Sequence, residues 1–200
     1  MRKSNNRSTK ENENTKATGS IRIIAGKHRG RKLPVLMADG LRPTTDRVKE
    51  TLFNWLMPYI NQSQCLDCFA GAGSLGFEAL SRGAKQVTFI ELDKKAARQL
   101  QQNKQLLNAE NITINNSNAL TFLTTPSDTF DVAFIDPPFR KGLVEQTVTL
   151  LNNGWLNDNA LIYIEMESEG GQLSLPSNWS LLKEKVAGQV SYRLYQRKPK

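Results

Sequence analysis

A glycine-rich segment, AGAGSLG, stands between a short apolar run and an amphipathic run, and this order restricts the possible folds more than any other feature. The apolar run covers residues 65–69, and the amphipathic run continues to about Gly83. Gly71, Gly73 and Gly76 fit the pattern G-x-G-x-x-G, in which glycines let the backbone approach a ligand closely and leave the first N–H groups of the helix free. The segment therefore predicts a strand, a ligand-binding turn and a helix.

The rest of the chain continues this alternation. Apolar runs predict strands at residues 86–90, 112–114, 130–135 and 160–165, and amphipathic runs predict helices at residues 93–107, 119–123 and 143–151. Residues 179–197 alternate in the manner of a β-hairpin about Gly188. The order predicts a doubly wound α/β fold, with a mostly parallel sheet, helices on both faces and an antiparallel C-terminal edge hairpin.

The first 60 residues have a different character. Residues 1–20 are rich in Asn, Ser, Thr and Lys, and they are predicted to form a disordered tail because they bury too little apolar surface to offset the entropy of ordering. Residues 21–60 predict a small β-hairpin and a helix, which Thr44 or Thr45 caps and which packs against the body. Residues 61–200 are predicted to form the main domain.

All of the excess positive charge lies at the front of the chain. Residues 1–50 hold 13 Lys and Arg against 5 Asp and Glu, whereas the other 150 residues hold 14 of each. A basic front end and a neutral body predict that the front end binds a polyanion such as RNA. The sequence GKHRGRK at the predicted hairpin turn supplies Lys27, His28, Arg29, Arg31 and Lys32 for contacts with phosphates, although a plain exposed loop is the alternative.

Several classes of protein are excluded. No run approaches the roughly 20 apolar residues of a membrane span, and no apolar segment follows the basic N-terminus as in a secretory signal. Cys65 and Cys68 form one C-x-x-C in a chain with a single histidine, which is too few ligands for a zinc site. We therefore expect a cytoplasmic protein without a metal, in which both cysteines are small residues of a buried strand.

An acidic residue stands at the matching end of the next predicted strand. Glu91 lies 20 residues after Gly71, where a carboxylate can bridge the hydroxyl groups of a ribose. At the end of the third predicted strand, Asn118 and Ala119 would face an adenine ring. The glycine pattern and Glu91 fit an NAD-binding domain and an S-adenosylmethionine (SAM) domain about equally.

Asp67 favours the second of these alternatives. It stands in the order Asp67-x-Phe69-x-Gly71-x-Gly73, with a carboxylate directly before the glycines. A carboxylate opposes the anionic pyrophosphate of NAD, whereas it attracts the ammonium group at the amino-acid end of SAM. The competing interpretation is a carboxylate that holds the loop or caps the helix.

The strand predicted at residues 130–135 ends in Asp136-Pro137-Pro138-Phe139. The prolines stiffen the turn and leave only carbonyl acceptors, Asp136 adds an anionic acceptor, and Phe139 offers a ring for stacking. This turn suits a flat ring that bears an amine, although an ordinary Pro-rich turn is the alternative. Ligands of open α/β sheets bind at the carboxyl ends of strands, so the turn and the predicted cofactor residues should share one crevice.

The order of these motifs resembles that of class I SAM-dependent methyltransferases of the amino-methylating kind, whose fourth motif reads D/N-P-P-Y/F. The resemblance narrows to the bacterial RsmD family on the segments RIIAGKHRGRKL, LRPTTDRVKETLFNWL, LDCFAGAGSLGFEALSRGA, FIELD, SNAL, DPPFRKG and KVAGQVSYRLYQR. It covers residues 21–197 and implies a Rossmann-like fold. It also implies methyl transfer from SAM to the exocyclic N2 amine of one guanine in 16S rRNA, by a monomer that acts on the small ribosomal subunit.

For such a reaction, Asp136 and the backbone carbonyl of Pro137 would accept the two amine protons, and Phe139 would stack on a flipped base. Arg140, within DPPFRKG, is a further expected RNA contact. Two positions depart from the wider methyltransferase pattern. Phe139 stands where tyrosine is commoner. Asn118 stands where an aspartate often binds the adenine amine, and the side-chain carbonyl of Asn118 can accept the same hydrogen bond.

Three other functions remain open at this point. An adenine-N6 DNA or RNA methyltransferase also suits DPPF, but little chain is left for a domain that reads duplex sequence. A non-catalytic RNA-binding protein of ribosome assembly would have no need for an intact Asp67, Glu91 and Asp136. An NAD oxidoreductase would leave DPPF without a role.

Overall fold

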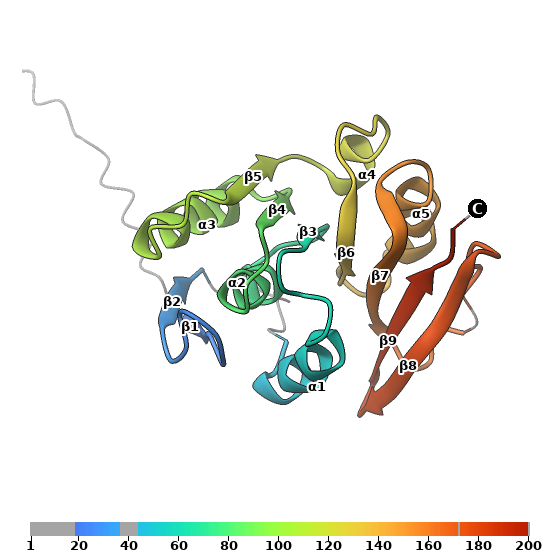
Figure 1. Ribbon diagram of the computed structural model, residues 1–200, viewed down its shortest axis with the longest axis horizontal. Helices are drawn as coiled ribbons and strands as arrows, with labels where there is room; N and C mark the ends of the chain where they lie inside the picture. The colour runs from blue at the N-terminus through green and yellow to red at the C-terminus, as the bar shows by residue number, and fades with distance from the viewer. Residues whose placement is uncertain (1–18, 37–43, 172, 200) are drawn as a thin grey trace, which may run out of the picture.

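The computed structural model describes residues 19–36, 44–171 and 173–199 (Figure 1). Within these ranges the main sheet consists of β3 (Gln64–Asp67), β4 (Gln86–Glu91), β5 (Ile112–Asn116), β6 (Phe130–Ile135), β7 (Leu156–Glu167), β8 (Trp179–Ala187) and β9 (Val190–Arg197). The helices are α1 (Asp46–Leu56), α2 (Ser74–Ser81), α3 (Lys94–Leu106), α4 (Ala119–Phe122) and α5 (Leu143–Leu151). A separate antiparallel hairpin of β1 (Gly19–Arg22) and β2 (Lys32–Val35) precedes them.

The strand order of the main sheet is β5-β4-β3-β6-β7-β9-β8. Strands β3 to β7 pair in parallel, whereas β9 runs antiparallel to both β7 and β8. The chain winds outward from β3 to β5 and then returns to β6 on the other side of β3, so the winding reverses between β3 and β6 (Figure 1). The predicted α/β fold, with its antiparallel C-terminal hairpin at one edge, is confirmed.

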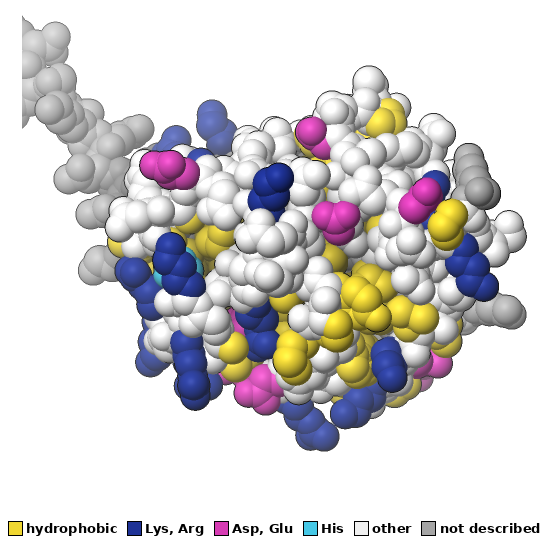
Figure 2. Space-filling view, viewed as in Figure 1, with side chains coloured by type: hydrophobic (Ala, Val, Ile, Leu, Met, Phe, Trp, Pro, Cys, Tyr) yellow, Lys and Arg dark blue, Asp and Glu magenta, His cyan; other side chains and the backbone are white. Residues whose placement is uncertain are grey.

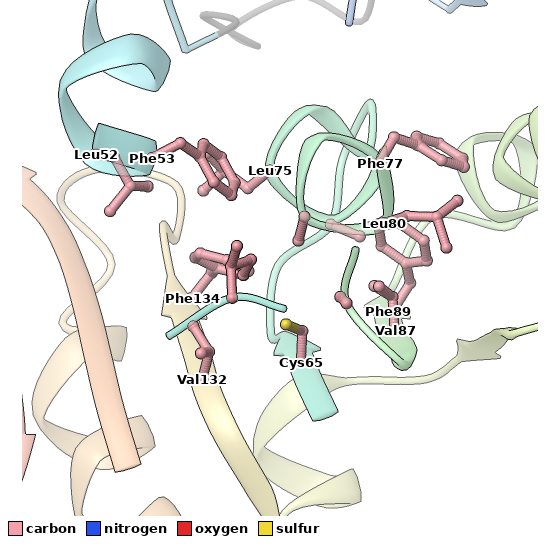
Figure 3. Close-up of a cluster of buried hydrophobic side chains, with 14 of the residues drawn as sticks. Leu52, Phe53, Cys65, Leu75, Phe77, Leu80, Val87, Phe89, Val132 and Phe134 are labelled. Carbon is pink, nitrogen blue, oxygen red and sulfur yellow. The ribbon is translucent and has the colours of Figure 1, made fainter. Parts of the chain in front are cut away.

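The two faces of the sheet carry separate apolar clusters, because successive strand residues point to opposite faces. Along β6, Val132 and Phe134 belong to the cluster beneath α1, α2 and α3 (Figure 3). Ala133 and Ile135 belong to the cluster beneath α4 and α5. The ring of Phe53 on α1 lies 6.0 Å from that of Phe134, so α1 packs on the sheet as its apolar periodicity predicts.

The β1–β2 hairpin is attached to the C-terminal half of α2. The buried carboxylate of Glu78 accepts the N–H groups of Ile24 at 2.8 Å and Ala25 at 3.1 Å, and it also accepts Nε of Arg82 at 2.7 Å. The hydroxyl of Ser81 donates to the carbonyl of Ala25 at 2.5 Å. The predicted N-terminal extension is therefore fixed to the helix that follows the glycine loop.

The predicted N-terminal tail is too long by two residues. Gly19 and Ser20 form the start of β1, because they pair with Val35 and Pro34 of β2. Residues 1–18 lie outside the described residues. No helix in the part of the chain that the structure describes is long and apolar enough to cross a membrane.

Several strands of the main sheet have different bounds from those predicted, and β5, for example, continues to Asn116 instead of residue 114. β3 ends at Asp67 instead of residue 69, because the backbone turns there toward the glycine loop. β7 begins at Leu156, which pairs with Phe130 ahead of a register shift. Cys65 and Cys68 are buried and free, and burial raises the pKa of the Cys65 thiol to about 12, which fits a structural role.

Candidate active site

The predicted strand-end residues lie along one edge of the main sheet. In the order of the strands across the sheet, Asn118 follows β5, Glu91 ends β4, Asp67 ends β3 and Asp136 follows β6. These strands are parallel, so their carboxyl ends meet at the same edge. Asp67 and Asp136 stand on the two sides of the point where the winding reverses, which is where open α/β sheets bind their ligands.

The glycine loop is held by the carboxylates of two neighbouring strands. The N–H of Gly71 donates to Oε2 of Glu91 at 2.6 Å, and the N–H of Gly76 donates to Oδ2 of Asp67 at 3.2 Å. Oε1 of Glu91 also accepts the N–H of Asp93 at 2.7 Å. Each oxygen of Glu91 keeps one lone pair, so this half-buried carboxylate can still accept from two hydroxyl groups of a ligand.

Two positions of the loop require glycine. Gly73 has a φ of 78°, in the left-handed region, and a Cβ at Gly76 would overlap the ring of Phe89. Between them, the hydroxyl of Ser74 is buried and has no hydrogen-bond partner among the described residues. A buried hydroxyl without a partner is destabilising, so a polar ligand group at the start of α2 suits this position.

Asp67 is buried at the end of β3, with 2% of its surface exposed. Burial raises its pKa to about 7, the charge of Glu91 adds to the rise, and the N–H groups of Gly76 and Phe69 oppose it. Its contact with Gly76 matches the alternative interpretation, in which the carboxylate holds the loop. A carboxylate with so high a pKa would gain from a cation nearby, so loop holding and ligand binding are compatible.

Asn118 acts as the N-cap of α4. Its Oδ1 accepts the N–H groups of Leu120 at 2.9 Å and Thr121 at 3.2 Å, which uses both lone pairs of that oxygen. The helix cap therefore competes with the predicted hydrogen bond from an adenine amine to this carbonyl. The N–H of Ala119 opens the helix and has no acceptor within it, so Ala119 stays a candidate for an adenine contact.

The DPPF turn directly follows β6, and its residues differ in their exposure. Asp136 is half-buried and accepts a hydrogen bond from the hydroxyl of Thr44 at 3.4 Å. Pro137 is buried, whereas the ring of Phe139 is 36% exposed at the surface. Arg140 is almost fully exposed, and its Nε lies 4.0 Å from a carboxylate oxygen of Glu167. Its guanidinium is therefore available to a ligand.

Sequence reasoning assigned no role to Glu165, which lies beside Asp136. Ile135 pairs with Ile164 in the parallel register, so Asp136 and Glu165 follow as neighbours on one face of the sheet. The hydroxyl of Tyr163 donates to Glu165 at 2.9 Å. Burial raises the pKa of Asp136 well above its usual range, and the charges of Glu165 and Asp67 raise it further. Glu165 ends a predicted strand, as Glu91 does, and this position could have identified it as a candidate site residue.

The basic residues of the β1–β2 hairpin lie away from the DPPF turn, at the opposite end of α2 from the glycine loop. Four of them are exposed, namely Lys27, Arg29, Arg31 and Lys32. His28 is half-buried, and burial together with its basic neighbours lowers its pKa, so it contributes little charge. Lys and Arg side chains gather on the side of the molecule where this hairpin lies (Figure 2). The hairpin thus offers a cationic surface separate from the candidate site residues at the strand ends.

Comparisons with known proteins show which proteins this chain is similar to. A family model described as "Conserved hypothetical protein 95" matches residues 21–196. The ribosomal RNA small subunit methyltransferase D of Escherichia coli strain K12 is 58% identical, over 92% of this chain and 93% of the relative. The protein of the same name from Haemophilus influenzae is 62% identical, over 90% and 95%. A solved structure of yhhF from Escherichia coli has a TM-score of 0.86 and 57% identity, and covers 90% of this chain and 99% of that one.

Proposed function

Because the chain belongs to the family described as conserved hypothetical protein 95, the RsmD family, we propose that it is a SAM-dependent methyltransferase of 16S rRNA. It transfers a methyl group to the exocyclic N2 amine of a guanine. The observation that supports this most is the position of Asp67 and Asp136 on the two sides of the winding reversal. One carboxylate is suited to an ammonium group of the cofactor, and the other to an amine of the substrate.

The cofactor would lie along the carboxyl ends of β3, β4 and β5. Asp67 and the hydroxyl of Ser74 are suited to its amino-acid end, and Glu91 is suited to its ribose. The N–H of Ala119 is suited to its adenine ring. When bound, SAM supplies an electrophilic methyl group on its sulfonium sulfur.

The DPPF turn would hold the methyl acceptor. The exocyclic amine of guanine is a weak nucleophile, because its lone pair is delocalised into the ring. Hydrogen bonds from its two protons to Asp136 and to the carbonyl of Pro137 favour the pyramidal nitrogen that attacks in line. The amine would take the methyl group from the sulfonium sulfur of bound SAM, and it would release one proton to water. Phe139 stacks on the flipped base while this happens.

The rRNA would be held by exposed basic residues outside this crevice. The β1–β2 hairpin offers Lys27, Arg29, Arg31 and Lys32, and the DPPF turn offers Arg140. These contacts are with phosphates, so they position the RNA without reading its sequence. We further propose that the protein acts as a monomer in the cytoplasm, on small subunits that already carry ribosomal proteins.

Transfer of tritium from labelled SAM tests the proposed function. The purified protein is incubated with small ribosomal subunits from a strain that lacks the family member, and with naked 16S rRNA and plasmid DNA in parallel. We expect label on one guanine of the subunits, which mass mapping of nuclease fragments would locate. Label on DNA would favour the adenine-N6 alternative, and failure to bind SAM in calorimetry would favour a non-catalytic RNA-binding protein.

Binding of SAM is expected to release nearly one proton at pH 6. At this pH most Asp67 carboxyls hold a proton, because burial raises their pKa to about 7. The ammonium group of SAM is fully charged at pH 6 and favours the ionised carboxylate, so binding removes that proton. The affinity for SAM should therefore fall as the pH falls below 7, by up to about tenfold per unit. Calorimetry in buffers with different ionisation enthalpies measures the released proton.

The control for this linkage is Asp67→Asn, which should bind SAM more weakly and release no proton. If the enthalpy of SAM binding to the wild-type protein is the same in every buffer at pH 6, Asp67 does not contact the ammonium group. Its role would then be limited to holding the glycine loop.

A further inference from the structure

A groove of about 330 Å³ lies between the first turn of α1 and the tip of the β8–β9 hairpin. Thr45, Arg47 and Val48 line it on the helix side, and Lys185, Tyr192 and the turn between them line it on the hairpin side. This turn and α1 lie beside one another at the lower edge of the molecule in Figure 1, and Figure 2 shows Lys and Arg side chains along the same edge. The groove is separate from the β1–β2 hairpin and from the predicted cofactor residues.

The groove begins beside the proposed acceptor site. Tyr192 pairs with both Glu165 and Lys185, so these side chains form a row across β7, β9 and β8 on one face of the sheet. Asp136 continues the row just past the end of β6, and its partner Thr44 directly precedes the groove residues of α1. Three strand spacings separate β6 from β8, which is about 14 Å.

Arg47 and Lys185 bring positive charge that their acidic neighbours among the described residues do not neutralise. Both side chains are exposed. Asp46, next to Arg47, is engaged by two other basic side chains at 3.4 and 3.5 Å. Glu184, next to Lys185, lies on the opposite face of the strand and binds Arg193 at 2.6 Å. The groove is therefore cationic at both walls.

The floor of the groove is apolar and fixed. Tyr192 and Val48 are buried, and the ring of Tyr192 stacks on Trp55 at 5.7 Å between ring centroids. An apolar floor between two cationic walls suits a sugar–phosphate backbone, with ribose against the floor and phosphates toward the walls.

We propose that this groove binds the RNA strand that flanks the target nucleotide, with Arg47 and Lys185 contacting its phosphates. A span of about 14 Å corresponds to about four stacked nucleotides, so these contacts fall within about four nucleotides of the base in the acceptor site. The proposal rests on the proposed rRNA methyltransferase function and adds a further RNA-binding surface to it. The rRNA then contacts the protein at the β1–β2 hairpin, at the DPPF turn and at this groove.

Charge reversal at each wall tests the groove. Arg47→Glu places an acid in the first turn of α1, where the helix dipole favours it, and Lys185→Glu changes an exposed edge strand, so both variants should fold. We expect each variant to raise the KM for small subunits by about tenfold and to reduce the slope of log KM against log salt by about one. The affinity for SAM should stay unchanged. Lys198→Glu, an exposed lysine beyond the other end of β9, is the matched control and should behave as wild type.

Photo-crosslinking gives an independent measurement. A thiol-reactive crosslinker would attach selectively to the new cysteine of Lys185→Cys, because Cys65 and Cys68 are buried. We expect crosslinks within about four nucleotides of the methylated guanine, and none there from Lys198→Cys.

The two proposals fail in different ways. If wild-type protein labels the subunits but both reversals keep the wild-type KM and salt slope, the groove does not bind the flanking strand. Crosslinks from Lys185→Cys that map only to distant rRNA lead to the same conclusion. If wild-type protein labels no subunit, the proposed function itself is wrong.

Discussion

Replacement of Asp136 with alanine is expected to abolish methyl transfer to the small subunit while the affinity for SAM stays near that of wild type. The carboxylate lies at the end of β6, on the far side of the winding reversal from the proposed methionine end of the cofactor. Without it, one amine proton of the base has no acceptor, and the nitrogen is no longer held for attack. Loss of one such preorganised hydrogen bond lowers turnover by at least about 100-fold. Single-turnover transfer of tritium to subunits measures the rate, and calorimetry measures the affinity for SAM.

The fold should tolerate this change. Asp136 carries a raised pKa because of burial and the charges of Glu165 and Asp67, so its removal relieves repulsion among carboxylates. Chemical denaturation should therefore show no loss of stability. The matched control is Asp158→Ala, which removes an exposed carboxylate that pairs with Arg197 at 2.7 Å. If Asp136→Ala turns over within threefold of wild type, Asp136 has no role in the mechanism. If the variant loses affinity for SAM, Asp136 belongs to the cofactor site instead.

The common sheet edge of the candidate site residues could be predicted because each central strand is a short apolar run that ends in a polar residue. Asp67, Glu91 and Asp136 each close such a run, and in a parallel sheet those ends meet at one edge. An error of two residues in a strand bound, as at β3, leaves this result unchanged.

The use of each polar atom could not be predicted from the same pattern. Asn118 has the expected position, but its oxygen caps α4 through bonds that depend on the local turn. Glu165 stood at a predicted strand end without a role, because its neighbour Asp136 comes from another strand and their adjacency follows from the register. Periodicity places residues on faces and edges, whereas hydrogen bonds depend on distances that it does not contain.

Helix α2 links the glycine loop to the basic hairpin. It begins after Gly73 and ends at Ser81, so its eight residues span about 12 Å. Its first turn faces the glycine loop, and Glu78 and Ser81 near its end hold the backbone of the β1–β2 hairpin. A displacement of α2 would therefore affect both the proposed cofactor site and the proposed RNA surface. The sequence contained one sign of this link, an acid within an otherwise apolar helix face.

Replacement of Glu78 with alanine is expected to lower the free energy of unfolding by about 3–5 kcal/mol, the usual result of breaking a buried ion pair. Its carboxylate is 1% exposed, and the variant leaves Arg82 and the N–H groups of Ile24 and Ala25 without this acceptor. Urea denaturation measures the change. Glu50→Ala, on the exposed face of α1, is the control and should change stability by no more than about 0.5 kcal/mol.

The milder variant Glu78→Gln keeps the shape of the side chain and one carbonyl acceptor, so it should stay folded even if the alanine variant does not. In this variant the β1–β2 hairpin loses part of its anchor, and we expect weaker binding of rRNA with little change in SAM affinity, because the glycine loop lies at the other end of α2. Limited proteolysis should then cut first within residues 24–31. Equal losses of rRNA and SAM affinity would show that Glu78 supports α2 as a whole. Wild-type stability of both Glu78 variants would mean that the hydrogen bonds of Ser81 and the apolar packing of Ile23 and Leu33 are enough to hold the hairpin.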